Sequence, residues 1–280
     1  MDWGPMSKRT VALTAALLTL ARVSSAQSVG NMLKDDFKNA GKDVVAVWGA
    51  PFDASGRDWG IAAIAFGAFG ASMFADEAAS DWAIRNKDTD FFRALKPLRR
   101  GGYLFAGKYV VPPVAALYIA GIVFKDQNIR DFVMGCMATW AAEGIPRKGV
   151  ARLFGRARPD SLPDDPHNWE IGGGKNWMMR SFPAGHFANI MGCASYANNR
   201  FHLGAAEPLI YAIAGGVGVG RMADEAHWLS DTVIGGILGY AVGSEIARRS
   251  LARYDDRRRA PAVNVTPGMG GVRMSLRWTF

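Results

Sequence analysis

Residues 181–244 read SFPAGHFANIMGCASYANNRFHLGAAEPLIYAIAGGVGVGRMADEAHWLSDTVIGGILGYAVGS. Three apolar stretches within this segment have helix character, at residues 187–198, 208–220 and 232–244. Glycine recurs at a four-residue spacing in the third stretch, at Gly235, Gly239 and Gly243. This spacing places the glycines on one helix face and predicts close packing against a neighbouring helix.

Similar apolar stretches precede this segment, at residues 59–75, 109–124 and 132–142. The last of them is closed by Glu143 and Pro146. Together the six stretches predict an all-α fold, a bundle of about six helices within a domain of residues 58–250.

The segments between and after these stretches are polar. We interpret the charged residues 76–100 as a connector, and residues 160–181, rich in Pro, Asp, Gly and Asn, as a loop. Residues 251–280 predict a basic linker and then a short C-terminal β segment, because Val272 to Phe280 alternates apolar and polar residues. We expect this strand to pair near residues 262–268.

The composition bounds the class of protein and its partners. With 49% hydrophobic residues the chain is too apolar for a disordered protein. The formal charge of +8 fits anionic partners such as phosphorylated substrates or anionic lipid, although a generally basic surface explains much of it. No aromatic–basic nucleic-acid motif occurs in the sequence, so we do not expect nucleic acid as a partner.

The N-terminal residues 1–26 have the features of a secretory signal peptide. Lys8 and Arg9 form a short basic region, an apolar run follows, and small residues end at Ala26. The prediction is export to the cell envelope, as a periplasmic or membrane-associated protein; the alternative is an uncleaved membrane anchor. Residues 27–57 form an N-terminal polar and amphipathic segment.

The apolar stretches leave the relation to a membrane open. Only 59–75 and 109–124 approach the roughly 17–25 residues that a spanning helix needs. The shorter stretches favour a soluble or peripheral bundle. Six arginines within residues 248–259 favour spanning helices, because cytoplasmic flanks of such helices are basic.

The chain has two cysteines, Cys136 and Cys193, and both lie in apolar stretches. A buried thiol behaves as a small apolar side chain. We therefore expect free buried thiols rather than a disulfide or a metal-binding pair.

His227 and Asp231 predict a nucleophile and its partner. Four residues apart on a helix, they would share a face, so that the carboxylate holds one ring nitrogen while the other attacks. The alternative is that Asp231 or Ser230 caps a helix beside an ordinary histidine. A metal is not expected, because no Cys/His cluster or HExxH motif supplies further ligands.

Two arginines and a helix start predict a site for phosphate. Pro159 holds Arg158 in extended backbone, and Arg158 with Arg221 could clamp phosphate oxygens, although surface solvation is the usual state of any single arginine. Gly185 lets an anion approach the amides of a helix start, and His186 could protonate a leaving oxygen.

The motif order Arg-Pro, Phe-Pro-x-Gly-His and Arg-x5-His-x3-Asp resembles the type 2 phosphatidic acid phosphatase superfamily. That superfamily includes bacterial acid phosphatases, lipid phosphatases and vanadium haloperoxidases, and its signature is Lys-x6-Arg-Pro, Pro-Ser-Gly-His and Ser-Arg-x5-His-x3-Asp. The resemblance covers roughly residues 59–247 and is strongest in the second half. There LFGRARPD at 153–160 and HWLSD at 227–231 also look like the family.

Three positions depart from that signature. Ala151 stands where the family has lysine, and Ala184 and Gly220 where it has serine. Arg152, or Lys148 one helical turn before Ala151, could supply the missing charge. Loss of one donor to a transferring phosphoryl group can cost about 2–4 kcal/mol, so reduced activity is expected.

The resemblance implies a metal-independent phosphomonoesterase or diphosphatase that works without a cofactor through a phosphohistidine. His227 would be the nucleophile, Asp231 would orient it, and His186 would be the acid. The phosphate would be bound by Arg158, Arg221 and Gly185, with Arg152 as a stand-in for lysine.

The resemblance leaves the substrate and two alternatives open. A bundle lying in a membrane would imply a lipid phosphate such as phosphatidate, polyprenyl diphosphate or a lipid A phosphate. A soluble bundle would imply a nonspecific acid phosphatase. The alternatives are a vanadate-dependent haloperoxidase and a noncatalytic envelope protein with a degenerate site.

Overall fold

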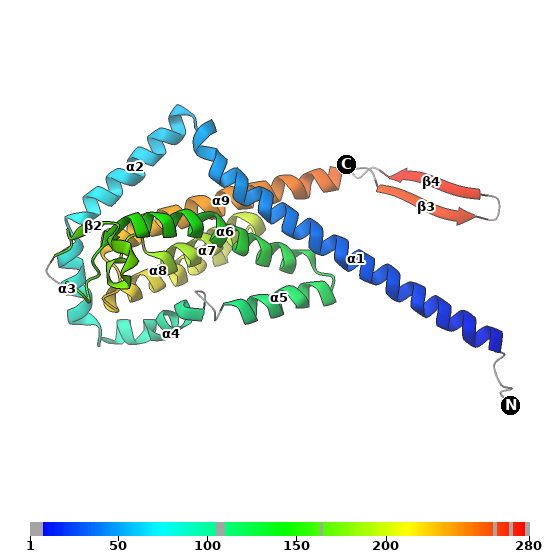
Figure 1. The fold of residues 1–280 in the computed structure, drawn as a ribbon, viewed down its shortest axis with the longest axis horizontal. Coiled ribbons are helices and arrows are strands. Elements are labelled where there is room, and N and C mark those ends of the chain that lie inside the picture. Colours follow the sequence, from blue (N-terminus) through cyan, green and yellow to red (C-terminus); the bar gives the residue numbers. More distant parts are fainter. Residues whose placement is uncertain (1–7, 105–109, 163–164, 260–261, 269–270, 278–280) are drawn as a thin grey trace.

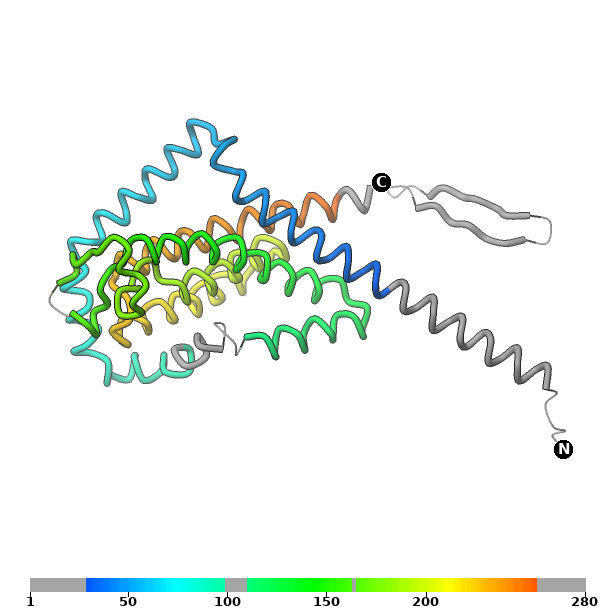
Figure 2. Tube along the Cα trace, in the orientation of Figure 1, coloured from blue at the N-terminus to red at the C-terminus, as the bar shows by residue number. Residues whose placement is uncertain are grey.

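The structure is a computed structural model of the 280-residue chain. It describes residues 8–104, 110–162, 165–259, 262–268 and 271–277, with side chains over 29–98, 110–162 and 165–255 (Figures 1 and 2). The predicted leader overlaps the start of the first helix, and its residues 1–7 lie outside the described residues.

The fold is all-α, as predicted. The helices are α1 Lys8–Gly49, α2 Gly56–Met73, α3 Asp76–Asn86, α4 Asp90–Leu104, α5 Val111–Val123, α6 Gln127–Leu153, α7 Gly185–Phe201, α8 Glu207–Ala223 and α9 Leu229–Arg259. The six predicted stretches correspond to α2 and to α5 through α9. Helices α6 to α9 lie together as the body of the bundle (Figure 1). Helix α2 connects α1 to α3 and contacts α9.

The interpretation of residues 76–100 as a connector is wrong, because these residues lie in α3, α4 and the short turn between them. The many charged residues in this segment hid the helical spacing of its apolar residues in the sequence. Ala83 and Phe92 are fully buried against Met222 and Ala223 of α8. Burial of this apolar face stabilises helices that the charge pattern did not indicate.

Two other boundaries predicted from sequence are wrong. Helix α6 continues through Pro146 to Leu153, so the basic residues that follow the proline are helical. Residues 251–259 continue α9 instead of forming a linker. The segment 27–57, predicted as polar and amphipathic, lies mostly in α1. Within the predicted loop, a short strand and two 3-10 turns form.

The glycine face of α9 packs closely on another helix, as predicted, and that helix is α7. A Cβ at Gly239 would collide with the Ala188 carbonyl, and a Cβ at Gly243 with the Gly192 carbonyl. A side chain at Gly235 would likewise press on Ala184. The two helices can approach this closely only because these positions carry no side chain.

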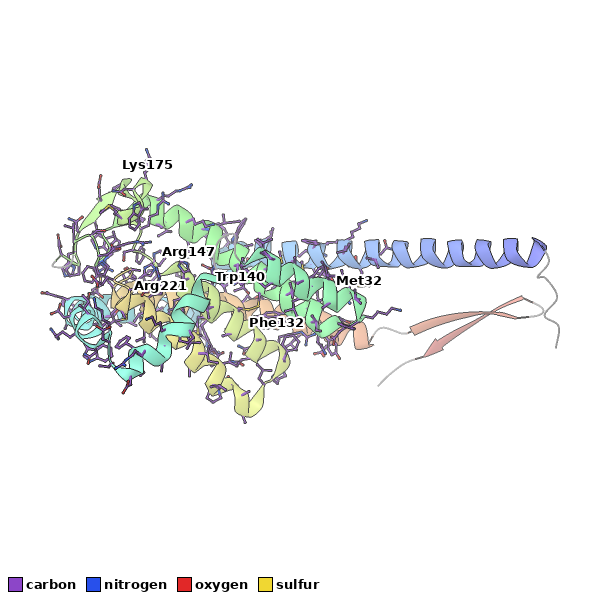
Figure 3. The ribbon with its side chains drawn as sticks, turned by 90° about the horizontal axis from the view of Figure 1, so that it is seen from below. Met32, Phe132, Trp140, Arg147, Lys175 and Arg221 are labelled. Atoms are coloured by element: carbon purple, nitrogen blue, oxygen red, sulfur yellow. A yellow bond between two sulfur atoms is a disulfide. The ribbon has the colours of Figure 1, made fainter. Side chains whose placement is uncertain are left out.

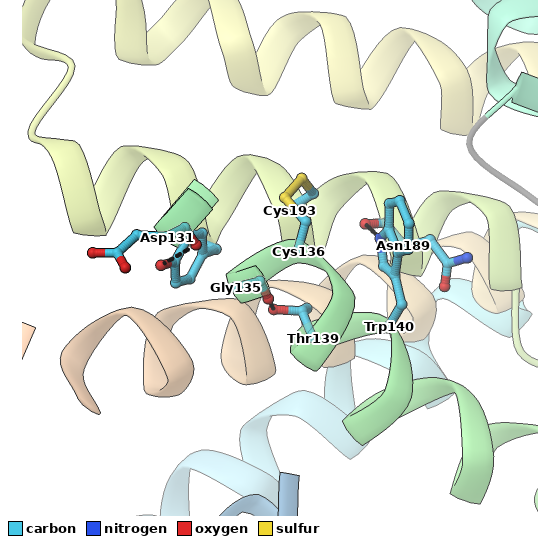
Figure 4. The surroundings of a disulfide bond; sticks show 8 residues. Asp131, Gly135, Cys136, Thr139, Trp140, Asn189 and Cys193 are labelled. Carbon is cyan, nitrogen blue, oxygen red and sulfur yellow. Dashed lines mark hydrogen bonds between the residues drawn. A yellow bond between two sulfur atoms is a disulfide. The ribbon is translucent and has the colours of Figure 1, made fainter. Parts of the chain in front are cut away.

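A disulfide joins Cys136 of α6 to Cys193 of α7 (Figure 4). The expectation of free thiols is therefore wrong. The two stretches that carry the cysteines are neighbours in the bundle, which places the Cα atoms 4.8 Å apart, within disulfide range. Closing a loop of 57 residues stabilises the fold by about 4 kcal/mol in the chain-entropy account.

Ion pairs tie α1 to the rest of the bundle. Asp43 of α1 is 2% exposed and accepts hydrogen bonds from Arg249 and Arg253 of α9, at 3.2 and 2.6 Å. On the same helix, Asp36 accepts from Arg130 of α6 at 3.0 Å. A buried carboxylate with charged partners fixes how these helices meet.

The predicted C-terminal β segment is confirmed. Strand β3, Ala262–Gly268, pairs antiparallel with β4, Gly271–Arg277, so the expected partner near 262–268 is also correct. The last predicted strand residues, 278–280, lie outside the described residues.

The described residues contain no single helix with the length and apolar composition of a membrane span. Helices α2 and α3 together pass that criterion as a pair bent by 62°.

Candidate functional site

Backbone pairing brings the first two motifs together. Strand β1, Phe154–Arg156, pairs with β2, Trp169–Ile171. The chain then returns, so that the Ser181 amide donates to the Arg156 carbonyl at 3.1 Å and the Arg158 amide to the Met178 carbonyl at 3.0 Å. The loop 160–181 thus returns the chain to the end of α6, and α7 starts there.

Arg156 is the centre of a buried ionic cluster. Its side chain is fully buried and donates to Asp76 of α3 and to Asp231 of α9, each at 2.6 Å. Ser230 donates its amide and its hydroxyl to Asp76, each at 2.7 Å. The guanidinium also lies 4.9 Å from the ring centre of Trp169. The cluster ties the first motif, the start of α9 and the start of α3 into one unit.

His227 lies in the turn between α8 and α9 and is 3% exposed. Its Nδ1 is 2.6 Å from the Ser181 carbonyl. A carbonyl oxygen can only accept, so Nδ1 must carry the proton and Nε2 the lone pair. The second motif region thereby sets the tautomer of the histidine in the third motif.

The predicted contact between His227 and Asp231 is wrong in its geometry. Helix α9 begins at Leu229, so the two residues do not share a helical face. The Asp231 carboxylate instead accepts from the Ser181 hydroxyl at 2.5 Å and from the Trp228 amide at 3.1 Å, besides Arg156. Asp231 therefore reaches His227 through Ser181. Its bond to the Trp228 amide, at the start of α9, agrees in part with the helix-capping alternative.

His186 lies in the first turn of α7. Ala184 is the N-cap residue of α7 and offers no side-chain bond to the helix amides, where the family signature has serine. The amides of Gly185 and His186 thus begin a 17-residue helix whose first turn has no acidic residue. Such a helix start favours an anion.

Arg147 is the cation that sequence reasoning missed. A Cβ at Gly185 would collide with the Arg147 guanidinium, so this group lies directly against the start of α7. Glu143, one turn earlier on α6 and fully buried, accepts from Arg147 Nε at 2.8 Å. The proposed stand-ins Arg152 and Lys148 are both exposed.

Figure 3 shows the same arrangement along α6. Its labelled residues run from Phe132 through Trp140 to Arg147, toward the end of the bundle where Arg221 of α8 lies. Arg221 is 4% exposed and pairs with Asp224 at 3.3 Å. Arg221, which was predicted, and Arg147, which was not, therefore lie toward the same end of the bundle.

The arginines make the site electropositive. Burial, together with the charges of Arg221, Arg147 and Arg158, lowers the pKa of His186 to about 4. Burial also lowers the pKa of His227 well below its usual value, again with Arg221 and Arg158 acting the same way. Both histidines are therefore neutral at pH 7, and the site is suited to an anion that would neutralise the arginines.

The carboxylates respond in the opposite direction. Burial raises the pKa of Asp231, opposed by the Arg156 charge, and burial raises the pKa of Glu143, opposed by Arg147. Arg158 is half-buried, with its guanidinium 5.1 Å from the ring centre of Trp177. Among the described residues, no group of three or more His, Cys, Asp or Glu side chains is arranged for a metal ion.

Sequence reasoning found the histidines and two arginines but missed four supporting residues. These are Asp76, Arg147, Arg156 and Ser181. Only Arg147 and Arg156 carried a signal, as members of the basic stretch after Pro146. Asp76 is distant in sequence, and its carboxylate reaches the cluster only because α3 packs beside α9.

The family model of the PAP2 superfamily matches residues 132–254. A lipid A 1-phosphatase of Porphyromonas gingivalis is 33% identical over 143 residues, which are 48% of this chain and 28% of that protein. The chain thus spans less than a third of that relative's length.

A solved structure is also similar. It is the crystal structure of a transmembrane PAP2 type phosphatidylglycerolphosphate phosphatase from Bacillus subtilis, with a TM-score of 0.43 and 18% identity. The superposition covers 70% of this chain and 96% of that chain.

Proposed function

Because this chain belongs to the PAP2 superfamily through residues 132–254, we propose that it is a phosphatase that acts on a lipid phosphate through a phosphohistidine. The observation that carries the proposal is the His227 tautomer. Its Nδ1 donates to the Ser181 carbonyl, so the Nε2 lone pair is available under the charges of the site arginines.

The reaction begins when His227 Nε2 attacks phosphorus. The N–P bond forms as the ester or anhydride P–O bond breaks, and the leaving oxygen takes a proton from His186. Water then attacks the phosphohistidine and gives a proton to His186, and the N–P bond breaks to release phosphate. Arg147, Arg158 and Arg221 stabilise the charge that spreads over the phosphoryl oxygens.

The protonation of His186 depends on the substrate in this proposal. In the empty site its pKa of about 4 leaves it neutral at pH 7. A bound phosphate dianion compensates the arginine charges and raises that pKa, so the acid forms only when substrate is present. The assignment of Arg147 as the third cation replaces Arg152, because Arg147 lies against Gly185.

Two observations support a lipid substrate at the cell envelope. The relative from Porphyromonas gingivalis is by name a lipid A 1-phosphatase. The Cys136–Cys193 disulfide fits an oxidising compartment, because disulfides persist mainly outside the cytosol. The disulfide also agrees with the predicted signal peptide.

The test uses the purified full-length chain with phosphatidate and with a water-soluble ester. We expect phosphate release that a chelator does not reduce and vanadate inhibits, and an acid-labile phosphate trapped on the protein. His227→Ala should lower kcat by about 10⁴-fold or more, as loss of a nucleophile does. The matched control is His167→Ala, at an exposed histidine, which should act like wild type.

The outcomes separate the alternatives. Full activity in His227→Ala, or loss of activity with chelator, would contradict the mechanism. No release from any ester by the wild-type chain would instead favour the noncatalytic envelope protein.

A further inference from the structure

An apolar groove of about 530 Å³ lies between α4, α5, α6, α7 and α8. None of the residues that line it is charged, and Asn128 is the one side-chain amide among them. The volume lies in the range of pockets that bind small organic ligands. Hydrocarbon is therefore the chemistry that the groove is suited to bind.

The groove begins one helical turn from the candidate phosphate site. On α7, Ile190 lines the groove four residues after His186, and on α8, Val217 lines it four residues before Arg221. Residues four apart share a helix face. The site and the groove therefore lie along the same faces of the two helices.

The lining continues along those faces. On α7 it runs from Ile190 to Phe201, and on α8 from Val217 back to Ile210. At a rise of 1.5 Å per residue, the α7 part extends over about 16 Å. One molecule with a charged head at Arg221 and a hydrocarbon chain would fill both regions.

We propose that this groove binds the hydrocarbon chain of the substrate whose phosphate is held at His227 and Arg221. The inference rests on the proposed function. It names the part of the protein that would distinguish lipid esters from water-soluble esters. Each methylene that leaves water can improve affinity by up to about fourfold. The value of kcat/KM should therefore rise with the length of the substrate's hydrocarbon chain.

The experiment compares butyl phosphate with octyl phosphate, using the purified full-length chain. We expect kcat/KM for octyl phosphate to be at least about tenfold higher, which is well below the limit of about fourfold for each added methylene. Ile213, which lines the groove and is 39% exposed, is changed to Asp. Ile213→Asp should remove the preference and leave butyl phosphate hydrolysis unchanged.

The matched control is Leu209→Asp, on the same helix at a position that is 61% exposed and outside the lining. It should keep the wild-type preference. Ile213→Trp, which fills the groove without adding charge, is the second variant and should also reduce the preference.

The failure of this inference differs from the failure of the proposed function. If both esters are hydrolysed and Ile213→Asp keeps the wild-type preference, the groove does not bind the chain, and bulk lipid or a second protein covers it. If neither ester is hydrolysed, calorimetry of octyl and butyl phosphate binding decides. Equal binding of the two by the wild-type chain would overturn the inference, and a preference lost in Ile213→Asp would support it.

Discussion

The two ends of α7 use arginine differently. At the C-terminal end, Arg200 donates to Asp131 of α6 at 2.8 Å. Close by, the Asp43 carboxylate accepts from Arg249 and Arg253 of α9. Each arginine there has a carboxylate within hydrogen-bonding distance, so these charges are compensated locally and hold helices together.

At the N-terminal end of α7 the arginine charge is not fully compensated. Arg147 and Arg221 each have a carboxylate neighbour, yet their charges and that of Arg158 still lower the pKa of His186. A positive field that reaches two neutral histidines is available to an anion. The comparison teaches that a nearby carboxylate does not by itself make an arginine a structural contact, because the paired Arg147 and Arg221 still act on His186.

Substitution of Arg156 should give the largest effect on stability. Like the arginines at the C-terminal end of α7, Arg156 is paired with carboxylates, those of Asp76 and Asp231. Arg156→Met leaves Asp76 and Asp231 buried without their cation. We expect the free energy of unfolding to fall by about 3–5 kcal/mol, measured by urea denaturation. Arg248→Met, at a side chain that is 69% exposed, should change it by less than about 1 kcal/mol. Equal losses in the two variants would mean that the buried cluster is not a structural tie.

Arg147→Ala should separate binding from stability. Losing one donor to the phosphoryl group should lower kcat/KM by about 10²–10³-fold. The loss of stability should be small, because burial already raises the pKa of Glu143 and that carboxyl can take up a proton.

The controls for Arg147 are exposed cations on the same helix and Arg253 near the C-terminal end of α7. Exposed Arg152 and Lys148, changed to Ala, should each alter kcat/KM by less than about threefold, because a single surface charge interacts weakly. Arg253→Ala should do the reverse of Arg147→Ala, lowering the free energy of unfolding by about 1–3 kcal/mol with kcat/KM unchanged. A large kinetic effect at Arg152 would restore the assignment made from sequence.

The pH dependence of stability should show the smallest effect. The pKa of His186 is about 4 in the folded chain and about 6.5 when unfolded, so below pH 6.5 the unfolded state binds the proton first. Stability should therefore fall as the pH drops from 6.5 toward 4, by about 2 kcal/mol at pH 5 from this group. His186→Gln should remove that part of the dependence, and added phosphate should reduce it. An identical pH profile for His186→Gln and wild type would contradict the lowered pKa of His186, which burial and the arginine charges produce together.

Much of the fold was predictable because helix periodicity and glycine spacing are local signals. The six apolar stretches and a close-packing face at Gly239 and Gly243 followed from residue order alone, whereas the neighbouring helix, α7, did not. Helices α3 and α4 were missed because charged residues surround Ala83 and Phe92, whose burial depends on α8. The disulfide was missed because the apolar context of Cys136 and Cys193 does not tell whether the fold brings the two side chains together.

The sequence by itself indicated the superfamily whose model matches residues 132–254, the helical class and the two candidate histidines, because each of these is encoded in short local patterns. It also indicated the short terminal hairpin, because strand alternation is local. Only the tertiary structure decided how the site is supported. The proton on His227 Nδ1 depends on the Ser181 carbonyl, and the third cation is Arg147 because α6 continues past Pro146 to the start of α7. These contacts join α6, the start of α7 with the segment before it, and the turn between α8 and α9. Distances between such separate segments are set by packing, which no local pattern records.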